Sequence, residues 1–158
     1  MPRAAPLAFA AFFAWSALPG CSAARKLEAR ESRDKAGLSE ASGEYWKGVR
    51  WSDVALQSKY LPRAEEQLAV AKIAATPVMR ISDVRLLQVA VDPELLSPPY
   101  KGELTTTRRE GVVLVHVEWY EVAGTRVVTE SVEQRWRMDA SGWTVDTEKS
   151  PIDVDRPW

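Results

Sequence analysis

The hydrophobic pattern of this 158-residue chain changes its period at Pro77, and this change limits the folds open to it. Between residues 38 and 75, apolar side chains recur at helical spacing, which predicts amphipathic helices. After Pro77, apolar and polar residues alternate along valine-rich stretches, which predicts strands with one buried face. Because the helices come first and the strands follow as hairpins, the order predicts an α+β domain whose N-terminal helices pack on a mostly antiparallel sheet.

Three helices are expected before the change in period, over residues 39–50, 54–60 and 63–75. Tyr45 and Trp46 mark the buried side of the first helix. Asp53 is expected to cap the start of the second helix rather than to act in catalysis. Pro62 ends the second helix and Pro77 follows the end of the third, because proline removes a backbone donor and restricts the residue before it.

Strands are expected over residues 78–92, 112–122, 127–138 and 143–147, with a loop at 92–99 and a short edge strand within 100–108. The clearest strand is 112–122, where Val113, Val115, Val117 and Trp119 share one face. In the next strand Gln134 shares a face with Val132 and Trp136. Five tryptophans are expected to face the core and to supply a large aromatic contact area: Trp46, Trp51, Trp119, Trp136 and Trp143.

The N-terminus has the parts of an export signal. Arg3 precedes an apolar run over residues 4–18, which as a helix would span about 22 Å. A bilayer core is about 30 Å thick, so the run is too short to cross it. Cys21, the only cysteine, follows directly. Two other interpretations stay open: an ordinary secretory cleavage site at Ser22-Ala23-Ala24, or an incidental cysteine within an uncleaved segment.

The four residues Leu18-Pro19-Gly20-Cys21 resemble the lipobox of bacterial lipoprotein signal peptides. The resemblance implies cleavage before Cys21 and acylation of that residue with two or three chains, including palmitate. Each buried methylene contributes about 0.8 kcal/mol, so such an anchor is effectively permanent. In a Gram-negative host, Ser22 at the second mature position implies sorting to the periplasmic face of the outer membrane.

The expected organisation is a signal peptide over 1–20, a lipidated polar tether over 21–37, one α+β domain over 38–148 and a tail over 149–158. The tether uses residues that favour helices but contains too few apolar side chains to pack, so low order is expected there. Removing the signal leaves 20 basic and 22 acidic side chains. Without a basic excess, nucleic acid is not an expected partner.

Three short segments within residues 38–147 resemble the nuclear transport factor 2-like, cystatin-like superfamily. They are Tyr45-Trp46 followed by Trp51-Ser52-Asp53, then residues 80–84, and the pair of segments 134–136 and 142–145. The resemblance implies a curved sheet folded around a long helix, forming a cone with a pocket at its mouth. Members of that superfamily include isomerases, cyclases and non-catalytic binding domains, so the fold does not specify a function.

Residues able to carry chemistry are few. The weak catalytic candidates are His116, Asp83 and Tyr120, with Glu118 and Glu130 as further carboxylates, because an isomerase pocket needs a base and an oxyanion donor. Gln134 and Trp119 are weak ligand-binding candidates, although Gln134 is better suited to tie the sheet together as a buried amide. His116 is the only histidine, so the sequence has no HxxxH or HExxH motif; no metal cluster and no cofactor are expected.

These observations favour a lipid-anchored, non-catalytic envelope domain that binds a protein partner or a small apolar ligand, held to the membrane through acylated Cys21. The alternative is a lipid-anchored isomerase- or cyclase-like enzyme that uses a pocket carboxylate or His116. A structural envelope protein without a ligand is a third hypothesis. A deep cavity that converges on His116, or on a buried carboxylate beside Tyr120, would favour the enzyme.

Overall fold

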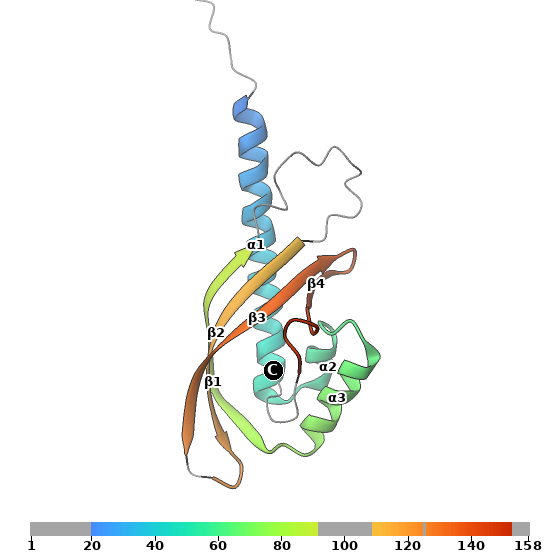
Figure 1. The fold of residues 1–158 in the computed structure, drawn as a ribbon, viewed down its shortest axis with the longest axis vertical. Helices are drawn as coiled ribbons and strands as arrows, with labels where there is room; N and C mark the ends of the chain where they lie inside the picture. The colour runs from blue at the N-terminus through green and yellow to red at the C-terminus, as the bar shows by residue number, and fades with distance from the viewer. Residues whose placement is uncertain (1–19, 92–108, 125, 153–158) are drawn as a thin grey trace, which may run out of the picture.

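The computed structural model describes residues 20–91, 109–124 and 126–152. Three helices precede a single antiparallel sheet with strand order β1-β2-β3-β4, as Figure 1 shows. The elements are α1 (Gly20–Trp51), α2 (Val54–Ser58), α3 (Ala64–Ala75), β1 (Met79–Val91), β2 (Arg109–Glu121), β3 (Val127–Asp139) and β4 (Gly142–Val145). The expected α+β class and the order of its elements are therefore confirmed. The signal peptide, the loop at 92–99 and the edge strand within 100–108 lie outside the described residues.

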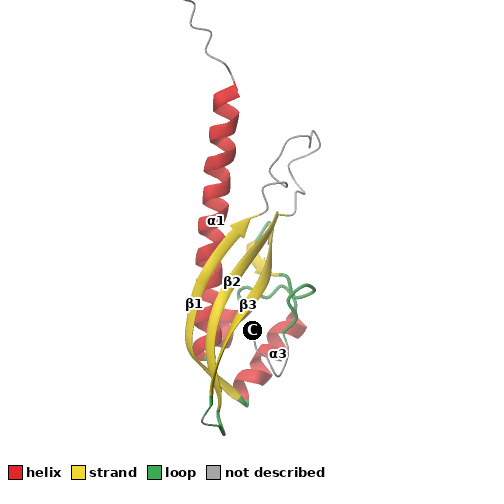
Figure 2. Ribbon diagram, turned by 60° about the vertical axis from the view of Figure 1, so that its left-hand side comes forward, coloured by secondary structure: helices red, strands yellow, loops and turns green. Residues whose placement is uncertain are grey.

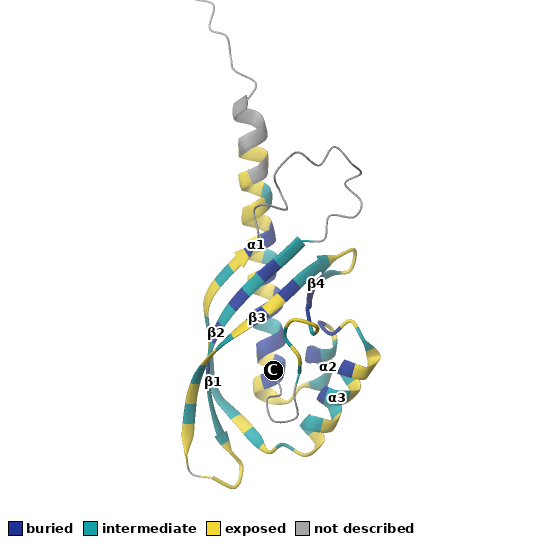
Figure 3. Cartoon of the chain, viewed as in Figure 1, coloured by how far each residue is buried: buried dark blue, intermediate teal, exposed yellow. Residues whose placement is uncertain are grey.

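The helix α1 is continuous over 32 residues and covers the whole segment expected to have low order, residues 21–37. Strong helix formers and the Glu31–Lys35 pair favour the helix there. Forming the first turn of a helix costs free energy, and the packed C-terminal half of α1 provides turns from which the helix extends. Along 25–33 its described side chains are mostly exposed (Figure 3). Burial begins at Asp34, one turn before the expected domain boundary at Leu38.

The strands are bent along their length, and the helices α2 and α3 lie on the concave side of the bend (Figures 1 and 2). In β1 the register to β2 shifts twice, between Ile81 and Asp83 and between Leu86 and Gln88. Each irregularity adds local twist and bends the strand. These two shifts let a 13-residue strand curve past α1 while apolar residues stay on its inner face.

The core lies between α1 and the inner face of the sheet. The predicted inward face of β2 is confirmed, since Val113, Val115 and Val117 are fully buried. Trp46, Trp136 and Trp143 are buried as expected, whereas Trp119 is half-buried. Trp51 contradicts the expectation, because 69% of its surface is exposed. It is five residues beyond Trp46 and therefore points about 140° around the helix from the buried side.

Gly111 on β2 permits a close approach of Leu38 and Trp143 to the strand. A Cβ atom at this position would lie 2.4 Å from Leu38 Cδ2 and 3.2 Å from Trp143 Cζ3. At such distances any side chain would force Leu38 or Trp143 to shift within the packed core. The glycine therefore lets Leu38 pack against the strand with no exposed surface.

Glu44 links α1 to the segment after α2, and this link predicts a pH effect. The carboxylate accepts hydrogen bonds from Lys59 Nζ at 2.7 Å and from the Tyr60 hydroxyl. The bond from Lys59, followed by that from Tyr60, lowers the pKa of Glu44. A lowered folded-state pKa stabilises the fold above the ordinary value of about 4.3, and the contribution is lost as the pH falls through the folded-state pKa.

We therefore expect the stability difference between the wild type and Glu44→Gln to be largest above about pH 4.3 and to shrink in more acidic solution. Urea unfolding of both proteins across a pH series measures this difference. A difference that stays constant with pH would contradict the role of the Glu44 charge.

Candidate functional site

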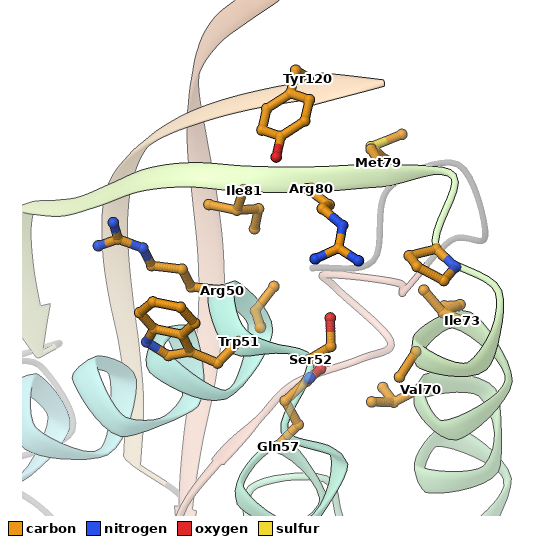
Figure 4. A pocket seen from close by; sticks show the side chains of 13 residues that line it. Arg50, Trp51, Ser52, Gln57, Val70, Ile73, Met79, Arg80, Ile81 and Tyr120 are labelled. Atoms are coloured by element: carbon orange, nitrogen blue, oxygen red, sulfur yellow. The ribbon is translucent and has the colours of Figure 1, made fainter. Parts of the chain in front are cut away.

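A pocket of about 210 Å³ opens where the end of α1, the helix α3 and the start of β1 meet (Figure 4). This volume is below the roughly 300–1,000 Å³ of pockets that hold drug-sized ligands, so only a small ligand fits. The lining residues are Val49, Arg50, Trp51, Ser52, Gln57, Val70, Ile73, Ala74, Pro77, Met79, Arg80, Ile81 and Tyr120.

The inner wall of the pocket is apolar. Val70 and Ile73 project from α3, and Met79 and Ile81 come from the start of β1. Helical spacing places the first two on one side of α3, and alternation places the other two on one face of β1. The wall is thus a continuation of the hydrophobic core toward solvent.

The rim of the pocket is positively charged. Figure 4 shows the Arg80 guanidinium and the Ser52 hydroxyl pointing toward each other across the opening. Neither side chain has a hydrogen-bond or ion-pair partner within the described part of the chain. Arg50 stands at one side of the opening, 5.4 Å from the centre of the Trp51 ring and 3.8 Å from Asp83 Oδ1.

The end of α1 places Ser52 at the rim. The Asp53 N–H donates to the Gly48 carbonyl at 2.8 Å and the Ser52 N–H to the Val49 carbonyl at 3.3 Å. These two bonds form a Schellman motif, in which the residue after the helix takes a left-handed conformation that usually requires glycine. Ser52 adopts it with a φ of 54°.

Replacing Ser52 by glycine is expected to raise the free energy of unfolding by about 0.5–1 kcal/mol. Glycine removes the left-handed penalty of about 1–2 kcal/mol but makes the unfolded chain more flexible, which offsets part of the gain. Ser52→Ala is the matched control, because it loses the same hydroxyl and keeps the strained Cβ. Urea unfolding measures both variants, and a glycine variant no more stable than the alanine variant would contradict the strain.

Most of the sequence-predicted catalytic candidates lie outside the pocket. His116 is on the outer face of the sheet, where it is paired with Arg85 on β1 and Ser131 on β3. Asp83 lies on the same face and forms an ion pair with Arg85 at 2.9 Å. Of the three candidates, only Tyr120 lines the pocket. The lining contains neither a carboxylate nor a histidine, so the described geometry assembles no acid–base pair there.

The two ligand-binding candidates, Gln134 and Trp119, also lie outside the pocket. Gln134 is buried, and its Oε1 accepts hydrogen bonds from Trp46 Nε1 at 3.0 Å and Trp136 Nε1 at 3.1 Å. Its amide oxygen therefore ties α1 to the sheet. Burial raises the pKa of the neighbouring Tyr45, which keeps this phenol uncharged. Trp119 donates to Glu130 Oε1 at 3.1 Å, so the polar end of its indole is engaged across the sheet.

Sequence reasoning missed the charged rim. Arg80 entered the sequence argument only as part of a segment at the start of a strand, and Trp51 was assigned to the core. The sequence offered only the presence of two arginines, Arg50 directly before the helix end and Arg80 at the strand start. Because they are 30 positions apart, their spacing does not show that the fold brings them to one opening.

A second concavity of about 690 Å³ lies on the other side of Ile73 and Met79. It is mostly apolar, and its lining residues Leu68 and Val78 are strongly exposed. Glu65 and Lys72 stand along it. It therefore adds exposed apolar surface beside the first pocket, without a convergent polar group of the kind that orients a small ligand.

The described residues form neither a metal site nor a membrane-crossing helix. No group of three or more histidine, cysteine, aspartate or glutamate side chains among them could hold a metal ion. None of the helices in these residues combines the length and apolar character needed to cross a membrane. Searches against protein-family models, curated proteins and solved structures found no match for this chain.

Proposed function

We propose that this chain is a bacterial lipoprotein, acylated at Cys21, whose α+β domain binds a small ligand in the cell envelope. The single observation that carries the ligand-binding part is the pocket at the end of α1, with an apolar wall and unpaired polar groups at its rim. The anchoring part rests on the apolar run over 4–18 followed by Leu18-Pro19-Gly20-Cys21.

The length of α1 supports a protein that is anchored at Cys21 and binds its ligand at the opposite end of this helix. Cys21 is near one end of the helix, and Trp51 at the other end lines the pocket. At 1.5 Å per residue the two positions are separated by about 45 Å. A helix of this length would hold the ligand site away from the acylated residue. We also propose sorting to the outer membrane, as Ser22 implies.

We also propose that the domain is a distant relative of the nuclear transport factor 2-like superfamily. Support comes from the helices that precede a bent antiparallel sheet and from the hairpin in which β3 carries Trp136 and β4 begins with Gly142-Trp143. The pocket lies at one end of the sheet, as a cone of that kind would place it. The enzyme alternative has no specific observation in its favour, since the lining carries no carboxylate or histidine.

Labelling with an alkyne analogue of palmitate in a Gram-negative host tests the anchor. We expect the wild type to carry the label in the outer-membrane fraction and Cys21→Ser to lose it. Mass spectrometry of the native protein, extracted from membranes with its ligands, then tests binding. A mature protein that retains residue 1 or an unmodified thiol would overturn the anchoring proposal. A protein partner without a bound small molecule would overturn the ligand proposal.

A further inference from the structure

We propose that the pocket takes a small amphipathic carboxylate, with its anionic head at Arg80 and Ser52 and its apolar body against α3 and β1. This inference rests on the proposed ligand-binding function and names the class of ligand. Three features support it: the charge of Arg80 has no acidic partner, the donors at the rim have the geometry of a carboxylate site, and the wall behind them is apolar.

The charge of Arg80 at the rim is not neutralised within the described part of the chain. Arg80 is exposed and has no acidic partner there. The acidic side chains closest in sequence to the rim residues are already engaged. Asp53 accepts from the Leu56 N–H at 3.0 Å as the cap of α2. Asp83 pairs with Arg85 at 2.9 Å and with Arg50 at 3.8 Å.

The donors at the rim match a carboxylate. A guanidinium presents a planar fork of N–H groups that fits the two oxygens of a carboxylate in a bidentate pair. The Ser52 hydroxyl faces Arg80 across the opening and offers a further donor to one of those oxygens. The backbone of Ser52 is held there in the left-handed conformation at the end of α1, so its place at the rim is set before a ligand arrives.

The wall behind these donors is apolar and of limited depth. Val70, Ile73 and Met79 line it, and the whole pocket has a volume of about 210 Å³. A short aliphatic or small aromatic body fills such a space and gains from burial of its apolar surface. A carboxylate without an apolar body would leave the wall in contact with water, and an alcohol of the same shape would leave Arg80 without its partner.

The test is isothermal titration calorimetry of the full acylated chain in phosphatidylcholine nanodiscs, with empty nanodiscs as the blank. Hexanoate is the probe. Acetate keeps the charge without the tail, 1-hexanol keeps the tail without the charge, and inorganic phosphate offers a different anion. We expect hexanoate to bind at least about tenfold more tightly than each of the other three, because a hydrogen bond to a charged group and apolar burial both contribute.

Variants locate the site. Arg80→Gln is expected to weaken hexanoate binding by about tenfold or more, and Arg80→Lys by less, because lysine keeps the charge but not the fork. Arg135→Gln is the matched control, since Arg135 is an exposed arginine on the outer face of β3 that pairs with Glu133 at 2.6 Å. It is expected to leave binding unchanged. Ser52→Ala is expected to weaken hexanoate binding and to leave hexanol binding unchanged.

Three results would overturn the inference. Hexanol that binds as tightly as hexanoate, with no effect of Arg80→Gln, would show that the pocket takes neutral apolar ligands, and the proposed ligand-binding function would stand. Phosphate that binds more tightly than hexanoate would show a different anion class. Absence of binding by every probe overturns the carboxylate inference, and the proposed function fails with it only if the native protein also carries no small molecule from its membranes.

Discussion

Replacing Gln134 by leucine is expected to lower the free energy of unfolding by about 2–5 kcal/mol. The indole N–H groups of Trp46 and Trp136 both donate to Gln134 Oε1, and all three side chains are almost fully buried. Leucine fills a similar space but accepts no hydrogen bond. Each buried donor that loses its acceptor costs about 1–3 kcal/mol, and two are affected here. Urea unfolding followed by far-ultraviolet circular dichroism measures the loss.

Gln88→Leu provides the control for the Gln134 variant. Gln88 is an exposed glutamine on β1, paired with Leu114 on the outer face of the sheet, so the same substitution removes no buried hydrogen bond. Its effect is expected to stay within about 0.5 kcal/mol. A similarly small effect for Gln134→Leu would show that the indoles find other acceptors and that Gln134 does not tie α1 to the sheet.

Arg109→Met is expected to destabilise the protein by about 3–5 kcal/mol at neutral pH, because it leaves the buried Asp34 carboxylate without its ion-pair partner. Arg109 Nη1 lies 2.6 Å from both carboxylate oxygens of Asp34, and the two side chains are only 16% and 9% exposed. Burial raises the pKa of the Asp34 carboxyl, while Arg30 and Arg33 oppose the rise. A carboxyl with a raised folded-state pKa binds a proton more readily in the folded state, so the deficit of the variant should shrink as the pH falls.

Two control variants distinguish the loss of the Asp34–Arg109 ion pair from the loss of any positive charge. Lys149→Met breaks an exposed ion pair with Glu110 at 2.7 Å and is expected to cost less than about 1 kcal/mol. The double variant Asp34→Leu/Arg109→Met removes both charges and is expected to recover most of the stability lost by Arg109→Met. A double variant as unstable as the single one would mean that packing around Arg109 matters more than the charge of Asp34.

The helices and strands were accessible to prediction because their signals are local. The periodicity of Val113, Val115 and Val117 is an alternation that any half-buried strand must show. The expected cap at Asp53 is confirmed by its hydrogen bond from the Leu56 N–H, because a helix start needs an acceptor wherever it lies in the fold. Low order was expected over residues 21–37, whereas the structure has the helix α1 there, since its packed C-terminal end supports the helix beyond the sheet.

The site was not accessible in the same way. Trp51 was expected in the core because tryptophan usually buries most of its surface, but the turn of α1 directs it outward to the pocket. His116 and Asp83 attracted interest by residue type, yet both lie on the outer face of the sheet, Asp83 because of the register shift after Ile81, and neither lines the pocket. Arg80 had no distinguishing local pattern.

The sequence by itself determined the α+β class, the order of the elements, the faces of β2 and β3, and the lipobox resemblance at Cys21, because each depends on residues within a few positions of one another. Only the tertiary structure decided which side chains meet. The pairing of Asp34 with Arg109, the bonds of two tryptophans to Gln134, and the opening shared by Ser52 and Arg80 all join distant segments. Such contacts follow from the bend of the sheet around α1 and from the exit of the chain at Ser52, which no local pattern specifies.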